Sequence, residues 1–134
     1  MLGEHGFWVL LDAVINEPHK VEAIVKNNRK ILSATNGIGE NVLRWFAVEN
    51  GLDQVKMLRS LGSPIQSSAL SEAVGLGHTR MVGMLLELGA EPDLVYCRNE
   101  LNSKFNKLTK RQKHIISSHF RDYGYELDEH IKLR

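Results

Sequence analysis

Apolar residues in the middle of the chain recur with the spacing of two short amphipathic helices, within residues 67–94. Residues three or four positions apart share one face of an α-helix, and glycine is a common helix end. We expect the first helix to be capped by Ser68 and to break at Gly77, and the second to stop at Gly89. Their inward-facing positions are Leu70, Ala73, Val74, Met81, Val82, Met84, Leu85 and Leu88. The pattern therefore predicts a pair of short antiparallel helices.

The same pattern recurs twice toward the amino terminus, at intervals of 27 and then 34 residues. Four series of positions share these two intervals: Val82, Val55 and Val21; Leu85, Leu58 and Ile24; Gly77, Asn50 and Asn16; and Gly89, Gly62 and Asn28. Asparagine tolerates the left-handed backbone conformation better than other non-glycine residues, so it suits a helix break. These series predict helix-pair repeats over residues 7–32, 36–65 and 66–94. The side chains in the series of Val82 and in the series of Leu85 should be buried.

The two earlier repeats carry their own local signals. The first should contain a helix over Phe7–Ile15, with Trp8 in the core, and a second helix that starts near Pro18. In the next repeat, Asn36-Gly37-Ile38-Gly39 predicts a turn, and Asn41 is placed to cap the helix that follows. The 27-residue interval predicts a shortened connection between the second and third repeats.

Residues 95–124 predict a more degenerate pair of helices that closes the stack. Leu101, Phe105 and Leu108 are spaced as one face of a helix, and Thr109 and Gln112 have the spacing of a capping box. The apolar face of the second helix would consist of Ile115, Ile116, Phe120 and Tyr123, before an end at Gly124.

The motif residues of the central repeat carry a family resemblance. They are Leu70, Ala73, Gly77, His78, Val82, Leu85, Leu86, Gly89 and Ala90. The stretch resembles an ankyrin repeat, whose pattern includes Leu-His-x-Ala-Ala-x-x-Gly-His followed by Val-x-x-Leu-Leu-x-x-Gly-Ala. The resemblance implies an all-α fold, a short ankyrin-like helical-repeat solenoid of about four repeats forming one domain over residues 1–134. It also implies a module that recognises protein surfaces and performs no chemistry.

Composition and charge narrow the class of partner. The chain has 134 residues, 43% hydrophobic and 25% charged, with a net charge of +1, as in ordinary globular domains. Residues 98–121 hold seven basic and one acidic side chain, a net +6. This stretch predicts either a solvated face or a docking patch for an acidic protein or for phosphates. Because Phe105 and Phe120 are assigned to the core, few aromatic rings remain for base stacking, and nucleic acid is the less favoured partner.

No pattern of catalytic or metal-binding residues is present. The six histidines lack the spacing of a zinc motif, and serines lack a nucleophile elbow. Cys97 is the only cysteine, which fits a reducing cytoplasm, and we expect an inert thiol in a loop. The apolar run of residues 7–15 is too short to cross a membrane. We therefore expect no enzyme activity, no cofactor and no membrane span.

The resemblance implies that partners bind the concave side, formed by first-helix positions and turn tips. The residues before each first-helix break would supply Val14, Ile15, Val48, Glu49 and Leu76, and the turn of the second repeat would add Ile38 and Glu40. In the weaker register of the last repeat, Lys110-Arg111 falls at the same place, with Lys107 beside it. An apolar stripe of this kind predicts a protein partner.

We expect a cytoplasmic protein-interaction module that is a monomer or weak homodimer and whose partner is unidentified. Small free-standing proteins of this kind include bacterial immunity or antitoxin-like proteins. The alternative function is a nucleic-acid or phosphate-binding protein that acts through the basic carboxyl-terminal cap. Salt dependence separates the two functions, because phosphate binding weakens steeply with added salt.

Overall fold

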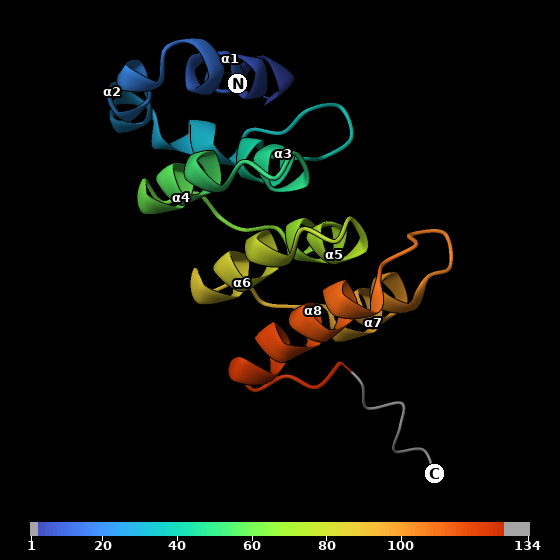
Figure 1. The fold of residues 1–134 in the computed structure, drawn as a ribbon. Coiled ribbons are helices and arrows are strands. Elements are labelled where there is room, and N and C mark those ends of the chain that lie inside the picture. Colours follow the sequence, from blue (N-terminus) through green and yellow to red (C-terminus); the bar gives the residue numbers. More distant parts are fainter. Residues whose placement is uncertain (1–2, 128–134) are drawn as a thin grey trace. The chain divides into compact units, whose positions relative to one another are not determined.

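The computed structural model describes residues 3–127, and this part of the chain is helical (Figure 1). Within it, the only bridge between extended residues pairs Thr35 with Asn41. The helices are α1 (Gly3–Asn16), η1 (Pro18–Lys20), α2 (Val21–Asn27), η2 (Arg29–Ser33), α3 (Val42–Val48), α4 (Leu52–Ser60), α5 (Ser67–Gly75), α6 (Thr79–Glu87), α7 (Leu94–Asn102) and α8 (Lys110–Asp122). The predicted all-α class is therefore confirmed.

The chain forms two compact units, residues 1–66 and residues 67–134. The division falls one residue from the predicted boundary between the second and third repeats. Ser68, the predicted cap of the following helix, lies inside the first turn of α5, because that helix begins at Ser67. The two units are described separately below.

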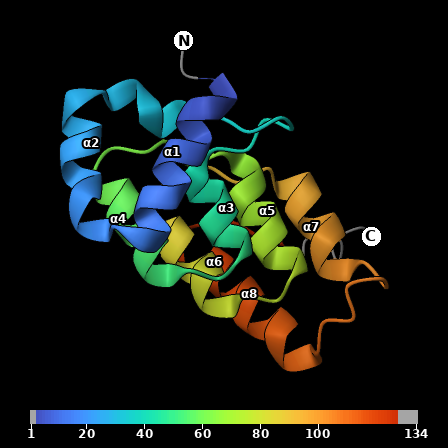
Figure 2. The ribbon, with the colours of Figure 1, turned by 90° about the horizontal axis from the view of Figure 1, so that it is seen from above.

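The first unit begins with α1, whose buried face consists of Phe7, Leu10, Leu11 and Val14. These positions follow the i, i+3, i+4, i+7 spacing of one helix face. The helix starts at Gly3, four residues before the predicted start. As predicted, Pro18 opens the next helical segment, where the short η1 leads into α2. Helix α1 packs against α2 and η2 (Figure 2).

Helices α3 and α4 show the local features predicted for residues 36–65. Asn41 caps α3, and its side-chain Oδ1 accepts a hydrogen bond from Arg44 N at 2.9 Å. Val55 and Leu58 in α4 have no solvent exposure. Between the helices, Asn50 adopts a left-handed conformation with φ of 62°, as the asparagine-for-glycine replacement predicts.

The same replacement was predicted at Asn16 and Asn28, and there it is wrong. Asn16 lies within α1, and Asn28 has an extended φ of −154°. In this part of the chain a proline-initiated 3-10 turn joins the helices, so no left-handed residue is needed. In the series of Leu85, Leu58 and Ile24 the buried position shifts by one residue, because Val25 is buried while Ile24 is half-buried, whereas Val21 is fully buried as predicted.

The turn at residues 36–41 and the shortened connection at residues 62–66 are held together by hydrogen bonds. Gln66 Oε1 accepts from Asn41 N at 3.0 Å, and Gln66 Nε2 donates to Gly39 O at 2.8 Å. Asn41 Nδ2 also donates to Pro64 O at 3.2 Å. One buried asparagine thus caps α3 and ties the connection to the turn.

The second unit contains two helix pairs in which like helices pack together, α5 against α7 and α6 against α8 (Figures 1 and 2). Of the predicted inward-facing positions, Met84 and Leu88 are half-buried, and the others are fully buried: Leu70, Ala73, Val74, Met81, Val82 and Leu85. Gly77, Gly89 and Gly124 all have positive φ at the predicted helix ends. The Thr109–Gln112 capping box at the start of α8 is also present.

Several predicted core residues are exposed instead. Trp8 is 44% exposed, because it lies beside the buried face of α1 rather than on it. Phe105 is 94% exposed, because α7 ends at Asn102 and the predicted helix does not continue. Tyr123, at the end of α8, is 45% exposed. Cys97 lies within α7 and is fully buried, whereas a loop position was predicted.

Candidate functional site

A small hollow of about 120 Å³ opens on the surface of α3 and the turn before it. We call it the α3 hollow, and its lining consists of Glu40, Arg44, Trp45, Val48 and Glu49. The residues follow an i, i+4, i+5, i+8, i+9 spacing, which places them along one side of the helix. The structure thus brings together three predicted partner-binding residues, Glu40, Val48 and Glu49.

The two carboxylates of the α3 hollow differ in what they can offer a partner. Glu40 forms an ion pair with Arg44 and accepts a hydrogen bond from Asn36 Nδ2 at 2.9 Å, and its side chain is only 18% exposed. Glu49 is exposed at the end of the helix. Glu40 therefore shapes the wall of the hollow, whereas Glu49 is accessible to a cationic group of a partner.

Trp45, which lines the α3 hollow, belongs to an aromatic cluster. The ring of Trp45 packs edge-on against Phe7 at 5.8 Å and against Trp8 at 5.9 Å between centroids. Trp8 Nε1 donates to Glu4 Oε2 at 3.4 Å. Phe7 is fully buried, so the accessible part of the cluster consists of the two tryptophan rings, a residue type enriched in interface hot spots.

The other predicted apolar partner-binding residues differ in their solvent exposure. Val14 is 4% exposed and belongs to the core, so it cannot contact a partner. Ile15 at the end of α1 is 57% exposed and Ile38 at the turn tip is 79% exposed. Leu76, which follows α5 in the second unit, is 47% exposed. Three of these apolar side chains thus remain available at helix ends and at a turn tip.

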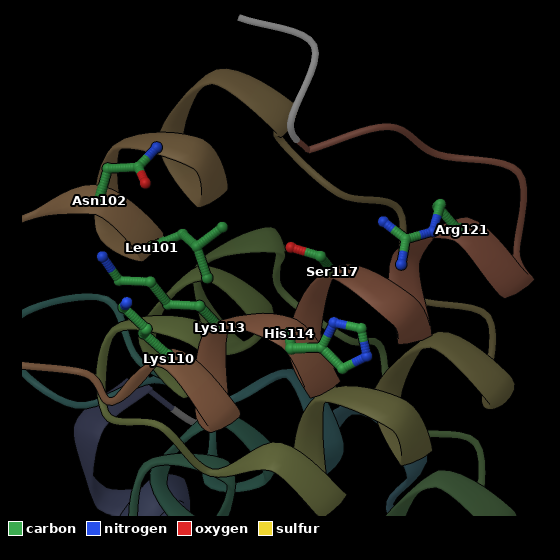
Figure 3. A pocket seen from close by; sticks show the side chains of 7 residues that line it. All are labelled: Leu101, Asn102, Lys110, Lys113, His114, Ser117 and Arg121. Atoms are coloured by element: carbon green, nitrogen blue, oxygen red, sulfur yellow. The ribbon is translucent and has the colours of Figure 1, made fainter. Parts of the chain in front are cut away.

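A second hollow, of about 240 Å³, lies beside α8 in the second unit. We call it the basic hollow. Its charged and titratable lining consists of Lys110, Lys113, His114 and Arg121, and Leu101, Asn102 and Ser117 complete it. Figure 3 shows Lys110 and Lys113 on the side of Asn102, with Arg121 at the other end and Ser117 between them.

The basic hollow contains only part of the predicted basic patch. Lys110, Lys113 and Arg121 line it, whereas Lys107 and Arg111 are exposed outside it. The predicted equivalence of Lys110-Arg111 with first-helix ends is wrong, because these residues begin α8, the second helix of its pair. The residue at the end of the first helix is Asn102, which lines the hollow.

The lining residues outside the predicted basic patch, Leu101, Asn102, His114 and Ser117, were missed as site candidates, although a signal was present for those on α8. Positions 110, 113, 114, 117 and 121 follow helical spacing, and at 3.6 residues per turn they fall within an arc of about 100°. The contribution of Asn102 could not be found in this way, because it depends on how α7 packs beside α8.

No constellation for covalent or metal chemistry appears in the described part of the chain. Burial, with smaller effects from Asp93 and Glu100, raises the pKa of the Cys97 thiol to about 12. This thiol therefore stays protonated and unreactive at neutral pH. Among residues 3–127, no group of three or more histidine, cysteine or acidic side chains is placed to hold a metal ion. No helix in this range is long and apolar enough to span a bilayer.

Sequence comparison finds a partial likeness to a known protein. The chain is 42% identical over 65 residues to palmitoyltransferase ZDHHC13 from Homo sapiens and, to the same extent, from Pongo abelii. The match covers 42% of this chain but 10% of either relative, so the chain spans about a tenth of their length. No family model and no solved structure matches the chain. The likeness is local and assigns no family.

Proposed function

We propose that this chain is a non-catalytic interaction module that binds a partner protein through helix ends and turn tips of an ankyrin-like solenoid of about four repeats. The α3 hollow carries this proposal. It offers Trp45 and Val48 as an apolar floor, with the exposed Glu49 at its edge. An apolar pocket with a polar rim and an aromatic ring in its lining is the usual anchor point of a protein interface.

The solenoid part of the proposal is supported by the recurrence of unusual backbone conformations. Asn50 and Gly77 are 27 residues apart, as are Gly62 and Gly89, and all four have positive φ. In the second unit, first helix packs on first helix and second on second. Stacked repeats bury their apolar faces in this way.

The non-catalytic part is supported by the state of the one thiol. Acyl transfer through a covalent intermediate needs an accessible, activated nucleophile. Cys97 is fully buried and its pKa is raised to about 12. The likeness to a palmitoyltransferase extends over a tenth of that protein, so its activity does not transfer to this chain.

The partner is a protein that presents an apolar side chain and a cationic group to the α3 hollow. A hollow of about 120 Å³ accommodates one side chain, and Glu49 can pair with a neighbouring lysine or arginine. We place the module in the cytoplasm, where its single cysteine suits a reducing environment. The narrower interpretation as an immunity or antitoxin-like protein stays a prediction of the family resemblance.

Site-specific photocrosslinking tests this function directly. A photoreactive amino acid at Val48 should crosslink a discrete partner in cells, whereas the same group at the exposed Lys56 on α4 should not. Val48→Asp should abolish capture of the partner identified in this way, with Lys56→Asp as the matched control. Equal capture by both variants would refute the role of the α3 hollow.

A second candidate function gains support from Phe105. Its ring is 94% exposed in the loop between α7 and α8, and Lys104 and Lys107 flank it. An exposed ring between lysines is an arrangement that binds single-stranded nucleic acid by stacking and charge. Binding of a single-stranded oligonucleotide that weakens steeply with salt and is lost in Phe105→Ala would favour this alternative.

A further inference from the structure

The basic hollow beside α8 concentrates positive charge in a concave surface. Lys110, Lys113 and Arg121 line it together with His114, and no acidic residue is part of its lining (Figure 3). On a solvated helix face, lysine side chains normally lie beside acidic residues or extend into the solvent. Here the four side chains come from one side of a single helix, with Lys110 and Lys113 near the end of α7 and Arg121 at the far end of the hollow, and together they raise its positive potential.

Most of the polar groups in the basic hollow are unused. The side chains of Lys110, Lys113 and His114 make no hydrogen bond or ion pair with any residue from 3 to 127. The same holds for the side chains of Asn102 and Ser117, and Ser117 is nearly buried. Arg121 already interacts with another residue, so it contributes charge. The hollow thus holds several hydrogen-bond donors that a bound anion would satisfy.

The placement of the cations costs stability at the start of α8. Lys110, Arg111 and Lys113 occupy its first turn, which contains no acidic residue. The amino-terminal end of a helix carries partial positive charge, so cations there are repelled and anions are attracted. A residue type that destabilises its own helix is characteristic of a functional position. A bound anion would relieve the repulsion.

We infer that the basic hollow binds a phosphate monoester. A dianion matches the several positive charges of the lining better than a carboxylate or a phosphodiester, each of which carries one negative charge. Lysine ammonium groups and the hydroxyl and amide of Ser117 and Asn102 all donate to phosphate oxygens. A volume of about 240 Å³ holds one phosphate and a small attached group. This inference is independent of the proposed protein partner.

The test is a titration of isotope-labelled protein with phenyl phosphate, followed by nuclear magnetic resonance at constant ionic strength. Dimethyl phosphate and acetate serve as singly charged probes of similar chemistry. We expect phenyl phosphate to shift the amide signals of Asn102 and of residues 110–121, and to bind at least about tenfold more tightly than either probe. Shifts spread evenly over all exposed lysines would overturn the inference.

A pair of charge-matched variants separates the hollow from general electrostatics. Lys110→Gln with Lys113→Gln removes two charges from the hollow and should weaken phenyl phosphate binding by about tenfold or more. Lys26→Gln with Lys30→Gln removes two charges at exposed positions outside it and should change the affinity by less than about twofold. An equal loss in both double variants would show that only net charge matters and would overturn the site.

A conservative variant controls for effects of the substitutions on folding. Lys113→Arg keeps the charge and the donors and should retain binding, provided its circular dichroism spectrum matches the wild type. Binding of dimethyl phosphate as tight as that of phenyl phosphate would contradict a monoester site and favour the nucleic-acid alternative. Because these titrations need no protein partner, failure here leaves the photocrosslinking result at Val48 unaffected.

Discussion

At the scale of single residues, the left-handed conformations show where the chain is strained. Asn50 and Lys107 are the non-glycine residues with positive φ among those described, at 62° and 54°. Asparagine tolerates this region, whereas lysine gains no compensating local hydrogen bond there. Strain at Lys107 lies in the loop that exposes Phe105, so this loop is held in shape at an energetic cost.

Replacing Lys107 by glycine should therefore stabilise the protein. Relief of the left-handed strain exceeds the greater entropy loss of glycine, and we expect a gain of about 0.5–1 kcal/mol in unfolding free energy. Lys107→Ala, which keeps a Cβ, should give no gain. Urea denaturation of both variants measures the difference, and a Lys107→Gly protein less stable than the Lys107→Ala protein would contradict the strain.

The buried thiol of Cys97 predicts a specific alkaline instability. Its pKa is near 9.0 in an unfolded chain and about 12 in the fold, so between these values only the unfolded state releases the proton. Unfolding is thus favoured as pH rises, by up to about 1.4 kcal/mol for each pH unit above 9.

Comparison with Cys97→Ala isolates this effect. Both proteins contain the same other groups that titrate at alkaline pH. The free energy of unfolding of the wild type should therefore fall more steeply than that of the variant between pH 9 and 11. The slopes are compared rather than the absolute values, because alanine leaves a cavity. Parallel slopes would mean that the thiol ionises within the fold, and rapid reaction with a disulfide reagent at pH 8 would show the same.

At the scale of elements, two helix caps of the same kind differ in their surroundings. Thr109 caps α8 at an exposed position through a bond from Gln112 N at 3.0 Å. Asn41 caps α3, is 2% exposed, and also donates to Pro64 O. A cap that holds a connection as well as a helix should contribute more to stability.

Thr109→Ala and Asn41→Ala should separate these contributions. Loss of an exposed cap costs about 1 kcal/mol. Loss of Asn41 should cost about 2 kcal/mol, because this nearly buried side chain also donates to Pro64 O, so that two hydrogen bonds are lost instead of one. Guanidinium denaturation gives both values, and equal losses would mean that the bond to Pro64 contributes nothing.

How much of each element the sequence could predict depends on whether the determining interactions are local. The caps at Asn41 and Thr109 and the helix end at Gly77 rest on neighbouring residues, and they were predicted. Periodicity alone could not show that α7 ends at Asn102, so Phe105 was wrongly assigned to the core. The basic hollow needed both α7 and α8, so only its half on α8 had a sequence signal.

At the scale of the whole molecule, the question is whether the two units unfold together. Each has its own core: Val55 and Leu58 in the first, and Val82 and Leu85 in the second, all without solvent exposure. In a repeat solenoid, stability is the sum of repeat terms and nearest-neighbour interfaces, so neighbouring repeats share one transition. Two independent units would instead unfold separately.

Leu58→Ala and Leu85→Ala distinguish these cases. Each truncation should cost about 2–5 kcal/mol, because each side chain is fully buried. If the proposed solenoid is correct, Leu58→Ala in the first unit should also increase amide hydrogen exchange at Val82, and Leu85→Ala should do so at Val55. The exposed Lys56→Ala should change neither. Exchange confined to the mutated unit would show two independently folding units, and the continuous solenoid would then be wrong even though each helix pair is correct.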